Sequence, residues 1–396
     1  MANVLYISYD GMFEPLGRSQ VLNYLKRLSK SHKIVLISYE KKSDWRQKEQ
    51  RKRLKQELCK ASVIWKPMRY HKDPSSLATA YDILRGILTS TYIILKHRIK
   101  IVHARSYVPS VIALVIKKLF NKKFIFDMRG YWADERVDGD LWQKNSRVYK
   151  VAKWFEKKFL TNADCVVSLT KAAINDMQEF EYLQNRKPWF ENITTCTDLD
   201  LFNINNNCNN KPQNSFTLGY VGSVGVWYLF DEVLKMFKLM CERGLKVNLH
   251  IINRDAHKYI AERISALNID AALIKIEALE HNEVAAAMQN MDAGMFFYKP
   301  AYSKIATAPT KLGEFLGCGV PCISNRSVGD VEGILENDKT GAVVKKFEFT
   351  DYNRCIDELL VLMKEETIKL RCRNAALKYF SLDEGVEKYN NIYNKL

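Results

Sequence analysis

Several features that define whole protein classes are missing from this sequence of 396 residues. No apolar run reaches the roughly 18–20 residues that a membrane-spanning helix needs. The nine cysteines are odd in number, form no Cys-x-x-Cys pair and have no histidine-rich cluster nearby, which argues against structural zinc and predicts a reduced protein. The first residues, MANVLYISYDG, have neither a basic segment nor a cleavage site. We therefore expect no signal peptide and a cytoplasmic location.

Nucleic-acid-binding signatures are also missing, although the chain is basic, with a net charge of +16. Residues 1–160 contain 34 lysines and arginines against 14 acidic residues, whereas residues 161–396 contain 27 against 31. A basic half-molecule predicts an anionic partner, which is a nucleic acid, a phosphorylated substrate or an anionic membrane surface. The basic residues are spread over several helices and match no zinc-finger, helix-turn-helix or RNA-binding pattern, so we expect no nucleic-acid partner.

The length of the chain fits two domains, and its alternating pattern predicts a doubly wound α/β fold for each. Short apolar segments such as residues 4–8 read as strands, and amphipathic segments such as residues 19–31 read as helices. We expect the strand at residues 62–66 to end at Pro67. Residues 127–142 have no helical apolar stripe, so a charge-dense loop is expected there.

An asparagine-rich segment, NINNNCNNKPQN at residues 203–214, separates two runs of this pattern and predicts a linker. Two Rossmann-like doubly wound domains are therefore expected to face each other across a cleft. The predicted segments are an N-terminal domain at 1–197, a hinge at 198–215, a second domain at 216–380, and a C-terminal helix at 381–396 that packs back on the N-terminal domain.

Ligands of open α/β sheets bind beyond the carboxyl ends of the strands, so the residues that follow strands are the candidates. After the first strand, Gly17 closes a glycine-bounded loop, and Arg18 and Ser19 begin the predicted helix. A cation beside a helix N-terminus suits an anionic ligand. The alternative is an ordinary loop in which Ser19 caps the helix.

Three further candidates, proposed as catalytic, follow later strands of the first domain: His103, Asp127 and Arg129. The last two open the segment DMRGYWADERVDGDLW, which combines dense charge with aromatic residues after a strand, a pattern typical of substrate contacts. The alternatives are a solvated loop with internal ion pairs and a structural histidine whose hydrogen bonds are satisfied.

The segment LGYVGSVGVWYLFDEV reads as a strand, a glycine-rich turn and a helix. Gly222 and Gly225 allow the backbone to approach a phosphate, and Ser223 lies between them. The segment is not the Gly-x-Gly-x-x-Gly dinucleotide fingerprint, because Gly219 falls within the strand and no acidic ribose partner follows at the usual offset. The predicted nucleotide site also includes two residues after the next strand, Asn253 and Arg254.

The segment APTKLGEFLGCGVPCIS, residues 308–324, reads as a short helix, a glycine stop and a strand. Pro309 suits the start of a helix, and Thr310 leaves its backbone N–H free for a ligand. Lys311 puts a cation at the positive end of the helix dipole, which is unfavourable unless an anion such as a diphosphate docks there. Glu314, on the same face, could accept hydrogen bonds from sugar hydroxyls. The alternative is a surface ion pair worth about 0.2–0.5 kcal/mol.

Together these motifs resemble the family-4, glycogen-synthase-like (group 1) retaining glycosyltransferases of the GT-B fold. APTKLGEFLGCGVPCIS resembles the donor-binding helix, YVGSVGVWY the phosphate loop, TTCTDLDLF the hinge, and RSVGDVEGILENDKTGAVV the Gly-x-x-Glu and Thr-Gly elements. DGMFEPLGRSQ, VHARSYVPS and FDMRGYWADERVDG are similar to a subgroup common among bacterial surface-polysaccharide transferases, which make capsule, O-antigen or exopolysaccharide.

The resemblance implies transfer of a sugar from a nucleotide-sugar donor, with the anomeric configuration kept and with no cofactor or obligatory metal. The N-terminal domain would bind the acceptor and the second domain the donor. The implied acceptor is a glycan or a polyprenyl-pyrophosphate-linked glycan. The basic N-terminal half is then expected to meet an anionic membrane surface, the inner face of the cytoplasmic membrane.

The resemblance also assigns individual residues of the second domain. Glu314 matches the second glutamate of the family's paired-glutamate motif, which holds the ribose, whereas the first glutamate is replaced by Ala306. The arginine and lysine of the family's phosphate loop fall near Ser223 and Tyr228, so both cations are missing. Lys311 is the expected substitute.

Two arginines of the first domain are assigned as well. Arg18 is the second candidate for the missing cations. Arg129 matches the strand-end position where many relatives carry a histidine near the donor sugar.

Three other functions remain open from the sequence. A GT-B-like sugar-nucleotide epimerase would need an acid/base pair, which the sequence does not reveal. A non-enzymatic protein that binds anionic polymers would explain the basic half. An inactive scaffold is suggested by Ala306 and Ser223.

Overall fold

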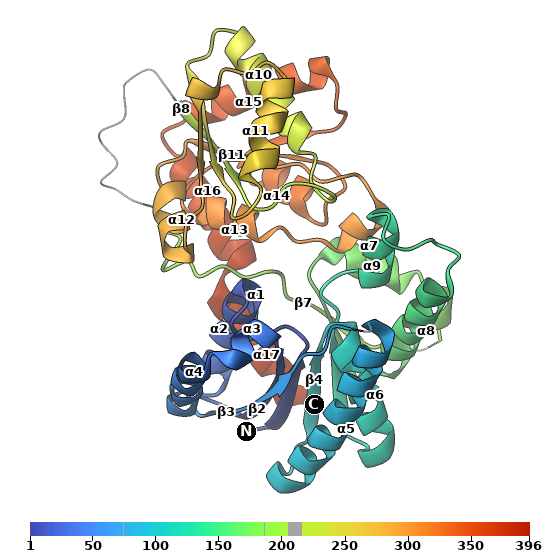
Figure 1. Ribbon diagram of the computed structural model, residues 1–396. Helices are drawn as coiled ribbons and strands as arrows, with labels where there is room; N and C mark the ends of the chain where they lie inside the picture. Colours follow the sequence, from blue (N-terminus) through green and yellow to red (C-terminus); the bar gives the residue numbers. More distant parts are fainter. Residues whose placement is uncertain (74, 186, 205–215) are drawn as a thin grey trace. The chain divides into compact units, whose positions relative to one another are not determined.

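The computed structural model describes residues 1–73, 75–185, 187–204 and 216–396, which divide into two compact units (Figure 1). The first unit contains residues 1–194 and 382–396, and the second contains residues 195–381. The part of the predicted hinge at residues 205–215 lies outside the described residues.

The first unit is built on a parallel sheet whose seven described strands run in the order β3-β2-β1-β4-β5-β6-β7. The central strands are buried on both faces, which explains their continuous apolar sequences. The strands are β1 Asn3–Ser8, β2 Lys33–Glu40, β3 Val63–Arg69, β4 Ile101–Arg105, β5 Lys123–Asp127, β6 Cys165–Ser168 and β7 Trp189–Asn192.

Helices connect these strands and cover the sheet, and one of them comes from the end of the chain. They are α1 Pro15–Gly17, a π-helical turn Arg18–Leu22, α2 Asn23–Leu28, α3 Lys42–Arg46, α4 Lys48–Lys60, α5 Ser75–His97, α6 Tyr107–Phe120, α7 Trp132–Asp138, α8 Arg147–Asn162, α9 Lys171–Gln178, a 3-10 turn Glu181–Leu183, and α17 Leu382–Lys395.

The first helical segment begins earlier than predicted. It begins at Pro15 and continues through the π-helical turn into α2, so Arg18 and Ser19 lie inside it. Proline suits the first turn, where its missing N–H costs nothing. The hydroxyl of Ser19 donates to the carbonyl of Pro15 at 2.9 Å. The alternative in which Ser19 caps the helix is therefore wrong.

Two further expectations for the first unit are corrected. Strand β3 does not end before Pro67 but pairs through it with β2. This is tolerated because β3 is an edge strand, where a missing N–H leaves no partner unsatisfied. The expected loop at residues 127–142 contains a helix, α7. Its charged face is paired with α8, because Tyr149 and Lys153 both donate to Asp134 at 2.8 Å.

The second unit is also doubly wound, with six described parallel strands in the order β10-β9-β8-β11-β12-β13. Its strands are β8 Phe216–Val221, β9 Val247–Ile252, β10 Ile274–Glu277, β11 Ala293–Met295, β12 Cys322–Asn325 and β13 Gly341–Val344. Its helices are α10 Phe230–Glu242, α11 His257–Ala266, α12 His281–Met288, α13 Thr310–Gly317, α14 Val331–Asn337, α15 Phe349–Met363 and α16 Ile368–Phe380, with 3-10 turns at Ala271–Leu273 and Tyr302–Ala306. The predicted two-domain Rossmann-like α/β fold is confirmed.

The first residues of the predicted hinge belong to the core of the second unit. Leu199 and Phe202 are buried there. The guanidinium of Arg373 donates to the carbonyls of both residues, at 2.8 and 2.6 Å. Residues 198–204 are thus held by burial and hydrogen bonds within this unit.

Candidate functional site

The glycine turn after β8 is the first component of the site in the second unit. Gly222 and Gly225 have φ angles of +119° and +102°, which only glycine adopts without strain. Asn253, at the end of β9, donates to the carbonyl of Gly222 at 2.9 Å and accepts the backbone N–H groups of Asp255 and Ala256. The buried side chain of Asn253 therefore holds the glycine turn in place through these hydrogen bonds.

Lys311, in the first turn of α13, is the most unusual residue of this site. Its side chain is buried, and its Nζ lies 4.5 Å from the ring centre of Tyr228, 5.2 Å from that of Tyr220 and 5.7 Å from that of Phe296. A Cβ atom at Gly222 would lie 2.9 Å from the same Nζ. Among the described residues, Nζ has no hydrogen-bond partner.

The surroundings of Lys311 change its pKa. Desolvation by burial disfavours the ammonium and lowers the pKa of Lys311 to about 7, while the carboxylate of Glu314 opposes the shift. Cation–π interactions with the three aromatic rings stabilise the ammonium in part. A negative charge placed beside Gly222, in addition to that of Glu314, would raise the pKa of Lys311 again and favour its protonated form.

Glu314 lies one turn further along α13. Burial raises its pKa to about 7, against the opposing effect of Lys311. None of the described residues donates a hydrogen bond to its carboxylate. Glu314 is therefore available to accept hydrogen bonds from an incoming ligand.

The start of α13 supplies further polar groups. Pro309 stands at the N-cap, and no side chain caps the helix. The hydroxyl of Thr307 is buried without a hydrogen-bond partner among the described residues. Uncapped N–H groups at the positive end of a helix attract anions. The start of α13, with Lys311, thus lies beside the glycine turn at the carboxyl end of β8.

Two other predicted donor residues contribute less in this structure. Ser223 points its side chain to solvent, and its carbonyl accepts the hydroxyl of Tyr220 at 2.6 Å. Arg254 is exposed, and no ion pair joins it to a described residue. Ala306, at the position of the missing glutamate, is buried.

The aromatic wall around Lys311 was not identified from the sequence. Tyr220 belongs to β8, Tyr228 follows the glycine turn, and Phe296 follows β11. These residues are far apart in the chain, and each alone reads as an ordinary core residue. Only the pairing of β8 with β11 brings them around one cation.

The candidate catalytic residues of the first unit lie in a buried ionic network at the carboxyl ends of β4 and β5. The carboxylate of Asp127 lies 3.7 Å from Nη1 of Arg129, 3.9 Å from Nη1 of Arg105 and 3.5 Å from Nε2 of His103. The hydroxyl of Tyr389, from α17, donates to Asp127 at 3.1 Å.

This network sets the charges of its members. Burial would raise the pKa of Asp127, but Arg129, the hydrogen bond from His103 and Arg105 outweigh it and lower that pKa to about 2. Burial lowers the pKa of His103, whose Nδ1 is 2.7 Å from the hydroxyl of Tyr393. Asp127 is thus an ionised partner of two guanidiniums at neutral pH, and His103 is neutral and fully enclosed.

Arg129 is the strained member of the network. Its φ angle of +60° is rare for a residue with a side chain, and such strain is concentrated at functional sites. Its guanidinium donates to the side-chain oxygen of Gln20 at 3.4 Å. The catalytic assignments of Arg129, Asp127 and His103 stay predictions.

Gly17 and Arg18 occupy different environments. Gly17 is buried where α1 approaches its own loop, because a Cβ there would lie 2.0 Å from the carbonyl oxygen of Gly11. Arg18 is exposed and forms no ion pair with a described residue. Arg18 lies three residues after the start of the helical segment at Pro15, and not at its first position as expected. Its assignment to the donor site stays a prediction.

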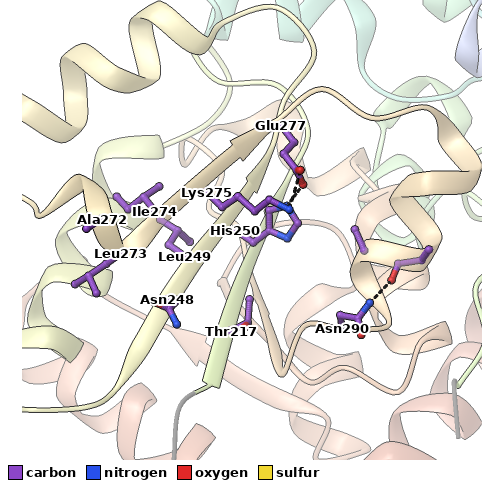
Figure 2. Close-up of a pocket in the computed structure, with 12 residues that line it drawn as sticks. Thr217, Asn248, Leu249, His250, Ala272, Leu273, Ile274, Lys275, Glu277 and Asn290 are labelled. Carbon is purple, nitrogen blue, oxygen red and sulfur yellow. Dashed lines mark hydrogen bonds and ion pairs between the residues drawn. The ribbon is translucent and has the colours of Figure 1, made fainter. Parts of the chain in front are cut away.

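A cavity of about 600 Å³ lies beside β9, β10 and α12, away from the glycine turn (Figure 2). In Figure 2 the side chains of His250 and Glu277 point toward each other, and Nε2 of His250 is 2.7 Å from the carboxylate. Its lining includes residues near the amino-terminal ends of strands, such as Thr217 and Asn248, together with residues of α12 and of the 3-10 turn before β10. Ligand sites of open α/β sheets lie at the opposite ends.

Two features are missing from the part of the chain that the structure describes. No helix among the described residues is long and apolar enough to cross a membrane. The described residues also hold no group of three or more histidine, cysteine, aspartate or glutamate residues that could bind a metal ion. The expectation that no metal is required stays a prediction.

Comparison with known proteins identifies the class. Residues 18–187 match the family model described as glycosyl transferase 4-like domain, and residues 203–377 match that of glycosyl transferases group 1. The two matches together account for most of both units. The chain belongs to the group 1 glycosyltransferases and is an enzyme of that class. No curated protein sequence matches it.

Solved structures agree on the fold. Sucrose-phosphate synthase from Thermosynechococcus elongatus superposes with a TM-score of 0.74 at 12% identity, covering 100% of this chain and 99% of that one. HepE from Anabaena, solved with UDP and glucose, gives 0.71 at 13%, and the lipopolysaccharide outer core galactosyltransferase WaaB in its apo form gives 0.65 at 11%, each covering 100% of both chains. At these identities the likeness establishes the GT-B fold.

Proposed function

We propose that this glycosyltransferase moves a sugar from a nucleotide-sugar to a glycan or lipid-linked glycan acceptor, with retention of configuration, in the synthesis of a surface polysaccharide. We also propose that it works in the cytoplasm at the inner face of the membrane. The motifs similar to the surface-polysaccharide subgroup support this choice, and so does the structural likeness to a lipopolysaccharide galactosyltransferase. HepE, another structure with this fold, was solved with UDP-glucose.

The observation that carries the donor half of the proposal is the buried ammonium of Lys311. A lysine without a hydrogen-bond partner, enclosed by three aromatic rings and facing a glycine turn, is costly for the free protein. The diphosphate of a nucleotide-sugar supplies the missing negative charge and hydrogen-bond acceptors. Such a ligand explains why the cation is kept there.

The same geometry suits departure of the nucleoside diphosphate. When the bond from the sugar to the diphosphate breaks, negative charge grows on the leaving phosphate oxygens. Lys311 and the uncapped start of α13 are already oriented toward that charge, so little reorganisation is needed. Glu314 would accept hydrogen bonds from the ribose hydroxyls and fix the nucleotide. No metal ion is invoked in this proposal.

The acceptor half of the proposal places the substrate against the first unit. Its basic residues suit an acceptor that carries a pyrophosphate-linked lipid and an anionic membrane surface. The guanidinium of Arg129, whose backbone φ is strained and which lies 3.7 Å from the carboxylate of Asp127, is the proposed contact of this unit with the substrate.

A thermal-shift panel of nucleoside diphosphates and nucleotide-sugars tests the donor half directly. One nucleotide should stabilise the protein, by about 2.7 kcal/mol at a hundredfold excess over its Kd. The variant Lys311→Met, measured by calorimetry with that nucleotide, should bind it roughly 10–100-fold more weakly, because a charge-assisted hydrogen bond is lost. Unchanged affinity in this variant, or no stabilising nucleotide in the panel, would refute the proposed site.

A further inference from the structure

Helix α5 of the first unit exposes an unusual row of large apolar side chains. They recur three or four residues apart along one face of a helix that runs from Ser75 to His97, and each is between 51 and 71% exposed. The row consists of Leu77, Tyr81, Leu84, Leu88, Tyr92 and Leu95. We call this row the α5 stripe. At 1.5 Å per residue it extends over about 27 Å.

Over most of its length, the buried face of the same helix lacks the large apolar residues that usually face a protein core. It carries Ala78, Gly86, Ser90 and the acidic residue Asp82, and only near its end the large apolar residues Ile93 and Ile94. Gly86 is in close contact there, because a Cβ would lie 2.4 Å from the hydroxyl of Tyr39. Up to Ser90 the helix therefore packs inward through small and polar residues, and its leucines lie on the exposed side. A monomeric soluble protein rarely exposes so continuous an apolar surface.

The charged groups of α5 that are not buried, and those that directly follow the helix, are basic, whereas the exposed Asp73 lies before its start. Arg85 lies over the ring of Tyr81, with 5.6 Å between its Cζ and the ring centre, and Lys96 donates to the hydroxyl of Tyr92 at 3.0 Å. Arg98 and Lys100 follow the helix directly. The acidic residue of the helix, Asp82, is fully buried and paired with His71 at 2.6 Å.

We propose that the α5 stripe is a membrane-docking surface, in which helix α5 lies in the plane of an anionic lipid bilayer with its leucines among the acyl chains and its cations at the headgroup phosphates. A helix with leucines and tyrosines on one face and basic residues beside them has the composition of helices that lie in the membrane interface. The inference deepens the proposed function, because it names the surface by which the enzyme reaches a lipid-linked acceptor.

Charge decides between a lipid surface and a second copy of the chain. Two α5 stripes packed together would bring Arg85 and Lys96 of both copies close, and no exposed carboxylate of the helix would offset them. A bilayer with anionic headgroups neutralises the same cations and takes up the leucines. The lipid surface is therefore the better occupant.

Flotation of the full-length protein with vesicles of phosphatidylcholine, with and without phosphatidylglycerol, tests the proposal. The wild-type protein should float with the anionic vesicles and bind neutral ones less. The variant L84S/L88S should bind the anionic vesicles roughly tenfold or more weakly than the wild type, because it lacks two leucines that the proposal places among the acyl chains. The matched control is V361S/L370S, which removes two equally exposed residues from α15 and α16 of the second unit and should bind like the wild type.

Three outcomes would overturn the proposal. The first is a wild-type protein that stays unbound, and the second is an L84S/L88S variant that floats as well as the wild type. The third is self-association of the wild-type protein in sedimentation without lipid, lost in L84S/L88S, which would show that a second copy covers the stripe. The thermal shift of each variant with its nucleotide reports the donor site separately, so a failed donor site and a failed docking surface give different results.

Discussion

At the scale of single residues, Lys311 combines a cost in the free protein with a use in the complex. Its ammonium is held away from water by Tyr220, Tyr228 and Phe296 and lacks a hydrogen-bond partner among the described residues. Active sites often keep such destabilising groups because the ligand needs them. Replacing Lys311 should therefore move stability and donor affinity in opposite directions.

The variant Lys311→Met tests this opposition. Methionine retains the length of the side chain and removes the desolvated charge, so the free energy of unfolding should rise by about 1–4 kcal/mol. Urea denaturation of the free protein measures this, and calorimetry with the nucleotide-sugar measures the accompanying loss of affinity. A variant that is both less stable and unimpaired in binding would contradict the role of Lys311.

The affinity for the donor should also depend on pH through Lys311. The pKa of this residue is about 7 in the free protein, and a bound diphosphate raises it, so binding takes up a proton above pH 7. Affinity should then fall as pH rises from about 7, by up to tenfold per pH unit until the pKa of the complex is reached. A nucleotide-sugar is the suitable probe, because its diphosphate has no proton to lose in this range.

The control for the pH experiment is the same titration with Lys311→Met, in which the fall in affinity above pH 7 should be absent. Calorimetry in two buffers with different ionisation enthalpies would measure the proton uptake directly. A wild-type affinity that does not change between pH 7 and 9, within twofold, would mean that Lys311 does not change its protonation on binding.

At the scale of structural elements, the site depends on how closely the glycine turn approaches α13. A Cβ at Gly222 would lie 2.9 Å from Nζ of Lys311, whereas one at Gly225 would meet nothing within 4 Å. Both glycines have positive φ angles, so alanine at either position strains the backbone. Comparing alanine at the two positions therefore distinguishes the effect of backbone strain, which both variants share, from displacement of Lys311, which only the change at Gly222 causes.

We expect Gly222→Ala and Gly225→Ala to lower the free energy of unfolding by similar amounts, about 1–3 kcal/mol. Gly222→Ala should in addition weaken donor binding by roughly tenfold, because the methyl group moves the ammonium. Denaturation and calorimetry on both variants make the comparison. Equal losses of affinity would show that the turn itself, and not the position of Lys311, matters for the donor.

At the scale of the whole molecule, the chain crosses back to the first unit after the second is complete. Helix α17 closes the ionic network there, since Tyr389 bonds to Asp127 and Tyr393 to His103. Asp127 and His103 are both buried. Gly222, Lys311 and Glu314, in contrast, lie within residues 195–381.

Removal of residues 382–396 should therefore destabilise the first unit and spare the donor site. His103 and Asp127 would lose both tyrosines and be exposed to water, at a cost of several kcal/mol for the buried charged group alone. Limited proteolysis should cut the first unit selectively, while the thermal shift with the nucleotide persists. The milder variant Tyr389→Phe, which loses only one hydrogen bond, should cost about 1.5–3 kcal/mol. Loss of nucleotide binding in the truncated protein would show that the two units do not behave independently.

The sequence alone determined the doubly wound fold and the residues at its strand ends. Alternating strand and helix patterns are local, and Lys311 is conspicuous because its charge opposes the dipole of its own helix. Local patterns were less reliable where distant partners decide the outcome. Helix α7 lacks an apolar stripe, but α8 pairs with its charged face. Strand β3 passes through Pro67 because none of the described strands pairs with its outer edge.

Only the tertiary structure decided how the candidate residues are surrounded. The desolvation of Lys311 depends on rings from β8, the glycine turn and the end of β11, which are brought together by strand pairing across the sheet. The ionisation of Asp127 depends on arginines from two strand ends and a tyrosine from the last helix. Burial and through-space charge are properties of atoms close in space, and the order of residues along a chain does not contain them.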